Sequence, residues 1–152
     1  MIRHLPAAMS TQKLLSTLDR LSPCQYDLVY LPHDKHTYKN ISLAWINFVD
    51  HLSAQRGFRD LQIVMGADPT WEVEVTAAKV QGCAANLAYF VARFGCDSLR
   101  LPSLPLVFAK GFQVPFHTAL KELVTGQLLQ EAREFFLAEC ASCGAGVQQE
   151  QG

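Results

Sequence analysis

Hydrophobic positions in the first 50 residues switch between helical and strand spacing. Residues 1–6 predict the end of a strand and a turn, either a very short strand or one that lacks upstream sequence. Leucines recur three and four positions apart between residues 10 and 21, which predicts an amphipathic helix capped by Ser10. Residues 26–32 and 41–49 are rich in aromatic and β-branched side chains and predict two strands joined by a polar loop.

The rest of the chain continues with alternating strand and helix patterns. Asp50 can cap a helix that reaches residue 61, and residues 71–77 alternate apolar and polar side chains as a strand does. Residues 82–94 repeat at helical spacing and end at Gly95, a residue typical of helix C-termini. The pattern then predicts a proline-interrupted connector over residues 99–115 and one last helix over residues 117–140. A disordered tail is expected over residues 144–152.

The order of these elements predicts a fold class. Strand, helix, strand, strand, helix, strand is the order of an α+β, ferredoxin-like βαββαβ sandwich, here with extra C-terminal helices. In that fold the helices cover one face of an antiparallel sheet. Alternation along residues 41–49 places Leu43, Trp45 and Asn47 on the other face, which we expect to be free.

Three segments, residues 1–6, 26–34 and 40–48, closely resemble the C-terminal RNA recognition motif (RRM) of the Mei-two-like family. The Tyr-Asp-x-x-Tyr-Leu-Pro string within residues 26–32 is the most specific part of this resemblance, which extends to about residue 108. The resemblance implies a single-stranded RNA-binding module in post-transcriptional regulation. The predicted organisation is an RRM domain over residues 1–108, a C-terminal helical extension over residues 109–143 and a disordered tail over residues 144–152.

The resemblance also implies where RNA would bind, and the chain departs from the common motif there. RRM domains stack bases on aromatic residues of the two central strands. Of the three positions that usually carry these aromatics, Trp45 keeps one, whereas Leu43 and Met1 occupy the other two. Tyr30 is either a base contact or a strand residue with its hydroxyl at the sheet edge. The candidate RNA-binding residues are Arg3, Tyr30, Lys35, Lys39, Leu43, Trp45, Asn47 and Lys79.

Each candidate has an expected role, and a second function remains open. Trp45 would stack a base, Asn47 and Arg3 would bind base edges or sugar, and the three lysines would contact phosphate. Alternatively, the chain is a degenerate RRM that binds a protein partner through Leu43, Trp45 and the helix at residues 117–140. That helix could itself lie across Trp45.

Composition narrows the function classes. The net charge of −1 argues against a generic polyanion binder, so a nucleic-acid site must be built locally. Five scattered cysteines and the lack of a signal peptide or membrane-spanning segment predict a nuclear or cytoplasmic protein with reduced thiols. No catalytic motif is present, so we expect no enzyme and no cofactor. Neither His33-Asp34-x-His36 nor Cys140-x-x-Cys143 has a complete ligand set for a metal.

Overall fold

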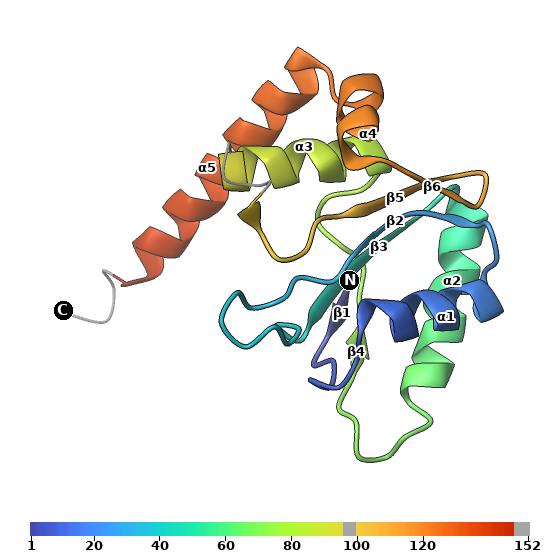
Figure 1. Ribbon diagram of the computed structural model, residues 1–152. Helices are drawn as coiled ribbons and strands as arrows, with labels where there is room; N and C mark the ends of the chain where they lie inside the picture. The colour runs from blue at the N-terminus through green and yellow to red at the C-terminus, as the bar shows by residue number, and fades with distance from the viewer. Residues whose placement is uncertain (96–99, 148–152) are drawn as a thin grey trace.

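Six short strands form one antiparallel sheet in this α+β protein, whose computed structural model describes residues 1–95 and 100–147 (Figure 1). The strands lie in the order β4-β1-β3-β2-β5-β6. Their bounds are Ile2–Arg3 (β1), Tyr26–Tyr30 (β2), Leu43–Phe48 (β3), Glu74–Val75 (β4), Leu106–Ala109 (β5) and Phe112–Val114 (β6). The described residues also form five helices: Thr11–Leu21 (α1), His51–Met65 (α2), Cys83–Phe94 (α3), Phe116–Leu123 (α4) and Gly126–Val147 (α5).

Strand register brings three of the predicted binding residues onto one part of the sheet. β1 lies between β3 and β4, with Arg3 opposite Leu43. β2 pairs with β3 so that Tyr30 lies opposite Trp45, and the register shifts by a bulge at Asp27. Because residues directly opposite in a sheet share a face, Arg3, Tyr30 and Trp45 all point to the same side.

The first face of the sheet is covered by α1 and α2, as expected (Figure 1). Both predicted caps are confirmed: Ser10 Oγ accepts a hydrogen bond from the Lys13 amide at 3.1 Å, and Asp50 Oδ1 accepts one from the Ser53 amide at 2.7 Å. α2 runs beyond the predicted end at residue 61. The buried hydrophobic residues of this core are Ile2, Leu5, Met9, Leu14, Leu18, Tyr26, Val29, Leu31, Ala44, Leu61 and Met65.

The prediction that the second face is free is wrong. α3 and α4 pack on it over β2 and β5, where Leu28 and Val107 are buried against Leu87 and Ala119. Leu28 and Val29 are consecutive in β2 and both are buried, so β2 buries a side chain on each face. A strand that is apolar on both sides needs cover on both sides, and α3 supplies the second cover.

The segment predicted as a connector, residues 99–115, contains a β-hairpin instead; residue 99 lies outside the described residues. β5 extends the sheet by pairing with β2, and β6 pairs with β5. Lys110 and Gly111, with φ of 51° and 83°, form the two-residue turn that hairpins favour. A Cβ atom on Gly111 would overlap Cys24 Sγ. β5 therefore crosses the domain boundary predicted at residues 108–109.

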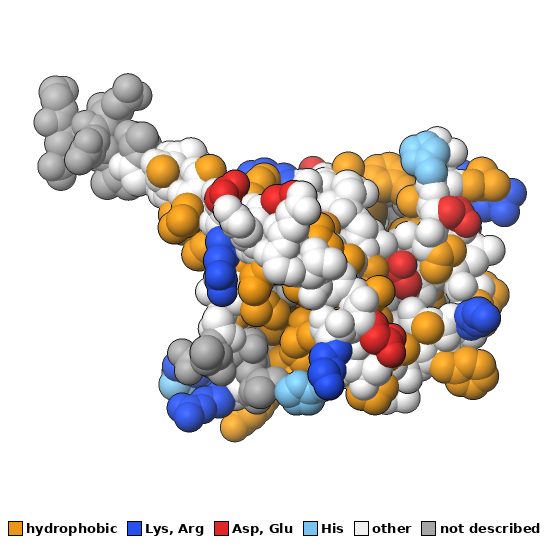
Figure 2. Space-filling view, turned by 90° about the horizontal axis from the view of Figure 1, so that it is seen from above, with side chains coloured by type: hydrophobic (Ala, Val, Ile, Leu, Met, Phe, Trp, Pro, Cys, Tyr) orange, Lys and Arg blue, Asp and Glu red, His pale blue; other side chains and the backbone are white. Residues whose placement is uncertain are grey.

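The predicted single helix at residues 117–140 is two helices. Val124 has an extended backbone that ends α4, and Thr125 Oγ1 accepts a hydrogen bond from the Leu128 amide at 3.2 Å to cap α5. α5 packs on α3 and then extends outward as an arm (Figures 1 and 2). The helix continues to Val147, which corrects the disorder predicted from residue 144; residues 148–152 lie outside the described part. No helix among the described residues is long and apolar enough to cross a bilayer.

Candidate functional site

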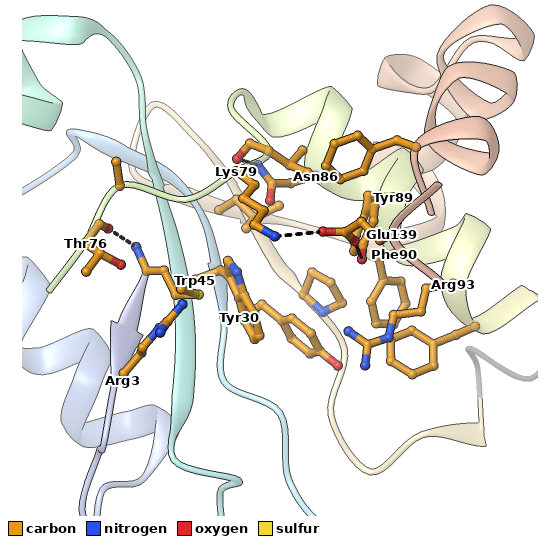
Figure 3. Close-up of a pocket in the computed structure, with 17 residues that line it drawn as sticks. Arg3, Tyr30, Trp45, Thr76, Lys79, Asn86, Tyr89, Phe90, Arg93 and Glu139 are labelled. Carbon is orange, nitrogen blue, oxygen red and sulfur yellow. Dashed lines mark hydrogen bonds and ion pairs between the residues drawn. The ribbon is translucent and has the colours of Figure 1, made fainter. Parts of the chain in front are cut away.

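A cleft of about 490 Å³ lies where the sheet, α3 and α5 meet (Figure 3). This volume falls within the range of roughly 300–1,000 Å³ that is common for small-ligand sites. The sheet contributes one side and the two helices contribute the other. The described lining residues are Met1, Arg3, Leu28, Tyr30, Trp45, Thr76, Ala77, Lys79, Val80, Asn86, Tyr89, Phe90, Arg93, Phe94, Pro105, Phe135 and Glu139.

Aromatic rings form the sheet side of the cleft. Tyr30 and Trp45 stack with their centroids 5.9 Å apart and their planes inclined by 25°. Phe90 of α3 packs edge-on against Tyr30 at 5.3 Å and holds it from the helix side. Burial raises the pKa of Tyr30 to about 12, so its hydroxyl stays protonated at neutral pH. Trp45 is only half-buried and therefore offers ring surface to the cleft.

Three basic side chains from separate elements surround these rings. Arg3 extends from β1, Lys79 from the segment after β4, and Arg93 from α3; all three are exposed. Lys79 Nζ lies 3.4 Å from Glu139 Oε1, whereas neither arginine pairs with a described carboxylate. Since the whole chain is slightly acidic, this local cluster is what makes the cleft suitable for an anionic ligand.

The helical wall carries a fixed carboxylate. Tyr89 of α3 donates a hydrogen bond from its hydroxyl to Glu139 Oε2 of α5 at 2.6 Å. This hydrogen bond, followed by the ammonium of Lys79, lowers the pKa of Glu139 below its ordinary value. Tyr89 also packs edge-on against Phe135, with ring centroids 5.8 Å apart. Glu139 is therefore ionised at neutral pH and held in one position by groups from two other segments.

Two further polar groups lie along the cleft. Asn86 Nδ2 donates to the carbonyl oxygens of Val80 at 3.3 Å and Gly82 at 2.8 Å, which fixes the orientation of its amide. Thr76 holds the one buried side-chain oxygen in the described residues that lacks a hydrogen-bond partner. Unpartnered buried polar atoms are uncommon in folded proteins.

The structure places Arg3, Tyr30, Trp45 and Lys79 of the predicted set together in this cleft. Leu43 is half-buried beside it, and Lys35 and Lys39 lie in the 33–40 loop, outside the described lining residues. That loop is closed by Asp34, whose Oδ1 accepts from the amides of His36 and Thr37, each at 2.8 Å. The described residues contain no cluster of His, Cys, Asp and Glu that could hold a metal ion.

The side chain of Asn47 is held by hydrogen bonds within the protein. Its Nδ2 donates to Asp27 Oδ1 at 2.8 Å and to the Phe48 carbonyl oxygen at 3.2 Å, and its Oδ1 accepts from the Gly82 amide at 3.0 Å. The side chain thus connects the bulge in β2 to the start of α3. Because both its donor hydrogens are used, the prediction that Asn47 is available to bind a base does not fit this geometry.

Sequence reasoning missed the helical side of the cleft, including Asn86, Tyr89, Phe90, Arg93 and Glu139. One available indication was that α3 is hydrophobic around most of its circumference, as its five consecutive apolar or aromatic residues 87–91 show. Helices of this kind are usually packed on two sides. Glu139 carried no such indication, since its contacts with Lys79 and Tyr89 span 60 and 50 residues of sequence.

Comparisons with known proteins do not assign the chain to a family. No protein-family model matches the sequence, and a search of curated proteins finds none similar to it. The arrangement of the cleft is therefore the main basis for inferring a function.

Proposed function

We propose that this protein is a single-stranded RNA-binding module that holds an unpaired base in the cleft and acts in post-transcriptional regulation. The observation that carries the proposal is the Tyr30–Trp45 ring pair with three basic side chains around it. Bases stack on aromatic side chains whatever their sequence, and nearby Arg and Lys side chains neutralise the phosphates that flank them.

We further propose that residues 1–75 form a ferredoxin-like core of the RRM kind. Supporting this, the elements run β1-α1-β2-β3-α2-β4, and the first four strands lie in the order β4-β1-β3-β2. β1 and β3 are central among these four strands, as the binding strands of an RRM are. Arg3 and Trp45 are on these two strands, so the predicted binding surface and the cleft overlap.

The cleft differs from a fully open RRM sheet in how much RNA it would hold. α3 covers the part of the face over β2 and β5, so RNA would reach only β1, β3 and the edge of β2. One base would stack beside Trp45, while Arg3, Lys79 and Arg93 contact phosphate. We expect this contact to cover one or two nucleotides, and a nuclear or cytoplasmic location fits the four free cysteines of the described residues.

A second candidate function is binding of a protein partner. The observation that favours it is Leu137 of α5, a large apolar residue that is 66% exposed. An apolar contact of that kind would depend little on salt, whereas phosphate contacts weaken steeply as salt rises.

The test is a fluorescence-anisotropy titration of labelled single-stranded RNA with the wild-type protein and Trp45→Leu, at several salt concentrations. Stacking of a base on an aromatic ring contributes ~1–3 kcal/mol, so we expect Trp45→Leu to weaken binding roughly 5- to 150-fold. Each phosphate contact contributes about −0.7 to the slope of log affinity against log salt, and Arg93→Gln should reduce the slope by about that amount.

Trp71→Leu is the matched control, because Trp71 packs against the first core on the other side of the sheet. It should leave RNA affinity unchanged in protein that circular dichroism shows to be folded. Absence of saturable binding by the wild type would contradict the proposal. An equal loss of RNA affinity in Trp45→Leu and Trp71→Leu would locate the binding outside the cleft.

A further inference from the structure

We infer that the cleft selects guanine among the four RNA bases, and that Glu139 is the residue that recognises it. The inference rests on the proposed function, since it names the base that the cleft would hold. A carboxylate is an unexpected group in a site for a polyanion, because it repels phosphate. It adds to RNA binding only where it faces hydrogen-bond donors of the RNA, and these are on the bases and the sugar hydroxyls.

Glu139 retains the capacity to accept further hydrogen bonds. An ionised carboxylate has about four lone-pair sites on its two oxygens. Among the described residues, Oε2 accepts from Tyr89 and Oε1 from Lys79, which leaves one site on each oxygen. The side chain is 29% exposed and lines the cleft, so a ligand can reach these sites.

Asn86 adds a second acceptor on the same wall. Its Nδ2 donates both hydrogens to backbone carbonyl oxygens, so its Oδ1 is the part of the amide left for a ligand. Figure 3 shows Asn86 and Glu139 on the helical side of the cleft, across from Trp45 and Tyr30 on the sheet side. A base stacked on Trp45 would therefore direct an edge toward the free acceptor sites of Asn86 and Glu139.

Guanine is the base whose edge matches this wall. Its Watson–Crick edge presents two adjacent donors, the N1–H and the 2-amino group, which suit the two oxygens of one carboxylate. Adenine and cytosine each present an amino group next to a ring nitrogen acceptor, and uracil presents one N–H between two carbonyl oxygens. In these three bases, an acceptor would face the carboxylate and oppose binding.

The experiment compares five labelled RNAs of seven nucleotides, in which the central position of oligouridine is G, inosine, A, C or U. Hydrogen bonds to a charged group are the strongest class, so we expect the G-containing RNA to bind at least about tenfold more tightly than oligouridine. Inosine lacks the 2-amino group and should fall between the two. The variant Glu139→Gln should reduce the G preference to within about twofold of the other bases.

Glu134→Gln is the matched control, because it neutralises another carboxylate of α5, one that accepts a hydrogen bond from Gln130 and lies outside the described lining residues. It should retain the G preference. Equal binding of all five RNAs, lost in Trp45→Leu, would overturn the guanine inference and leave the proposed function standing. Loss of the preference in Glu134→Gln as fully as in Glu139→Gln, or its retention in Glu139→Gln, would overturn the role of Glu139. No binding of any RNA would remove the proposed function itself.

Discussion

The two faces of the central sheet differ in chemistry although the same strands form both. The first face buries mainly aliphatic residues such as Val29 and Ala44 beneath α1 and α2, and its core is closed. The second face carries aromatic and charged residues such as Tyr30, Trp45 and Arg3, and α3 covers only part of it. A closed aliphatic layer stabilises the fold, whereas an aromatic layer left partly open provides surface for a ligand.

The two faces also differ in how their covering helices are attached. On the first face, α1 and α2 contact the sheet mainly through hydrophobic packing, with one hydrogen bond among the described residues from the Tyr26 hydroxyl of β2 to Asp19 of α1. On the second face, a larger set of polar contacts adds to the packing: Asn47 connects β2 and β3 to the start of α3, and Glu139 connects α5 to Tyr89 and Lys79. Polar contacts have defined directions, so they position the cleft wall more closely than aliphatic packing alone would.

The largest loss of stability from a single substitution is expected on the first face. Leu14 has 0% of its surface exposed, and Leu14→Ala should lower the free energy of unfolding by ~2–5 kcal/mol. Phe135 lines the cleft and is 39% exposed; Phe135→Ala should cost only about 1 kcal/mol, mainly its edge contact with Tyr89. Urea unfolding followed by circular dichroism measures both. An equal loss in the two variants would show that α5 belongs to the main cooperative core.

A smaller effect is expected where a helix approaches the sheet most closely. Gly57 of α2 packs directly on the ring of Phe48, and a Cβ atom there would overlap that ring. Gly57→Ala should lower the free energy of unfolding by ~1–3 kcal/mol, although alanine favours a helix over glycine. Gly126→Ala is the matched control, since a Cβ atom added there would meet no other atom within 4 Å, and unfolding should stay the same or become slightly harder. Equal stabilisation by both changes would mean that Phe48 moves aside.

Local signals in the sequence predicted most of the first 95 residues. The caps Ser10 and Asp50 and the terminal glycine Gly95 lie where their chemistry requires, and alternation assigned Ala44 and Trp45 to opposite faces. These features depend on neighbours within a few residues. They determine the elements, but not what covers the second face.

The errors concern contacts between distant segments. β5 has only four residues, and its pairing with Leu28 and Val29 across almost 80 residues cannot be detected from spacing. The break between α4 and α5 depends on Thr125 acting as a cap within an otherwise helical hydrophobic pattern. The candidate site was predicted on the sheet alone for the same reason: Tyr89 and Glu139 reach the cleft only through tertiary packing of α3 on α5.

The smallest effect expected is a difference in pH dependence between two aspartates. Burial raises the pKa of Asp27 on the second face above its ordinary value, and the hydrogen bond from Asn47 offsets part of that rise. The folded state therefore holds the Asp27 proton more tightly than the unfolded chain does. The free energy of unfolding falls as pH rises through the titration of this group. The amide of Asp27→Asn does not titrate, so this variant lacks the loss. Its free energy of unfolding should rise relative to that of the wild type as the pH increases from below to above the titration range of aspartate.

Asp50, the cap of α2 on the first face, provides the opposite case. Hydrogen bonds from Ser53 lower the pKa of Asp50, so its contribution to stability is present above the ordinary pKa of aspartate and is lost as pH falls. Relative to the wild type, Asp50→Asn should therefore lose stability over the same rise in pH. Urea unfolding of the three proteins at both ends of that pH range tests the pair. If both variants lost stability relative to the wild type as the pH rises, Asp27 would be as well solvated as a surface carboxylate. The polar connection from β2 through Asn47 to α3 would then not be the buried contact that distinguishes the second face from the first.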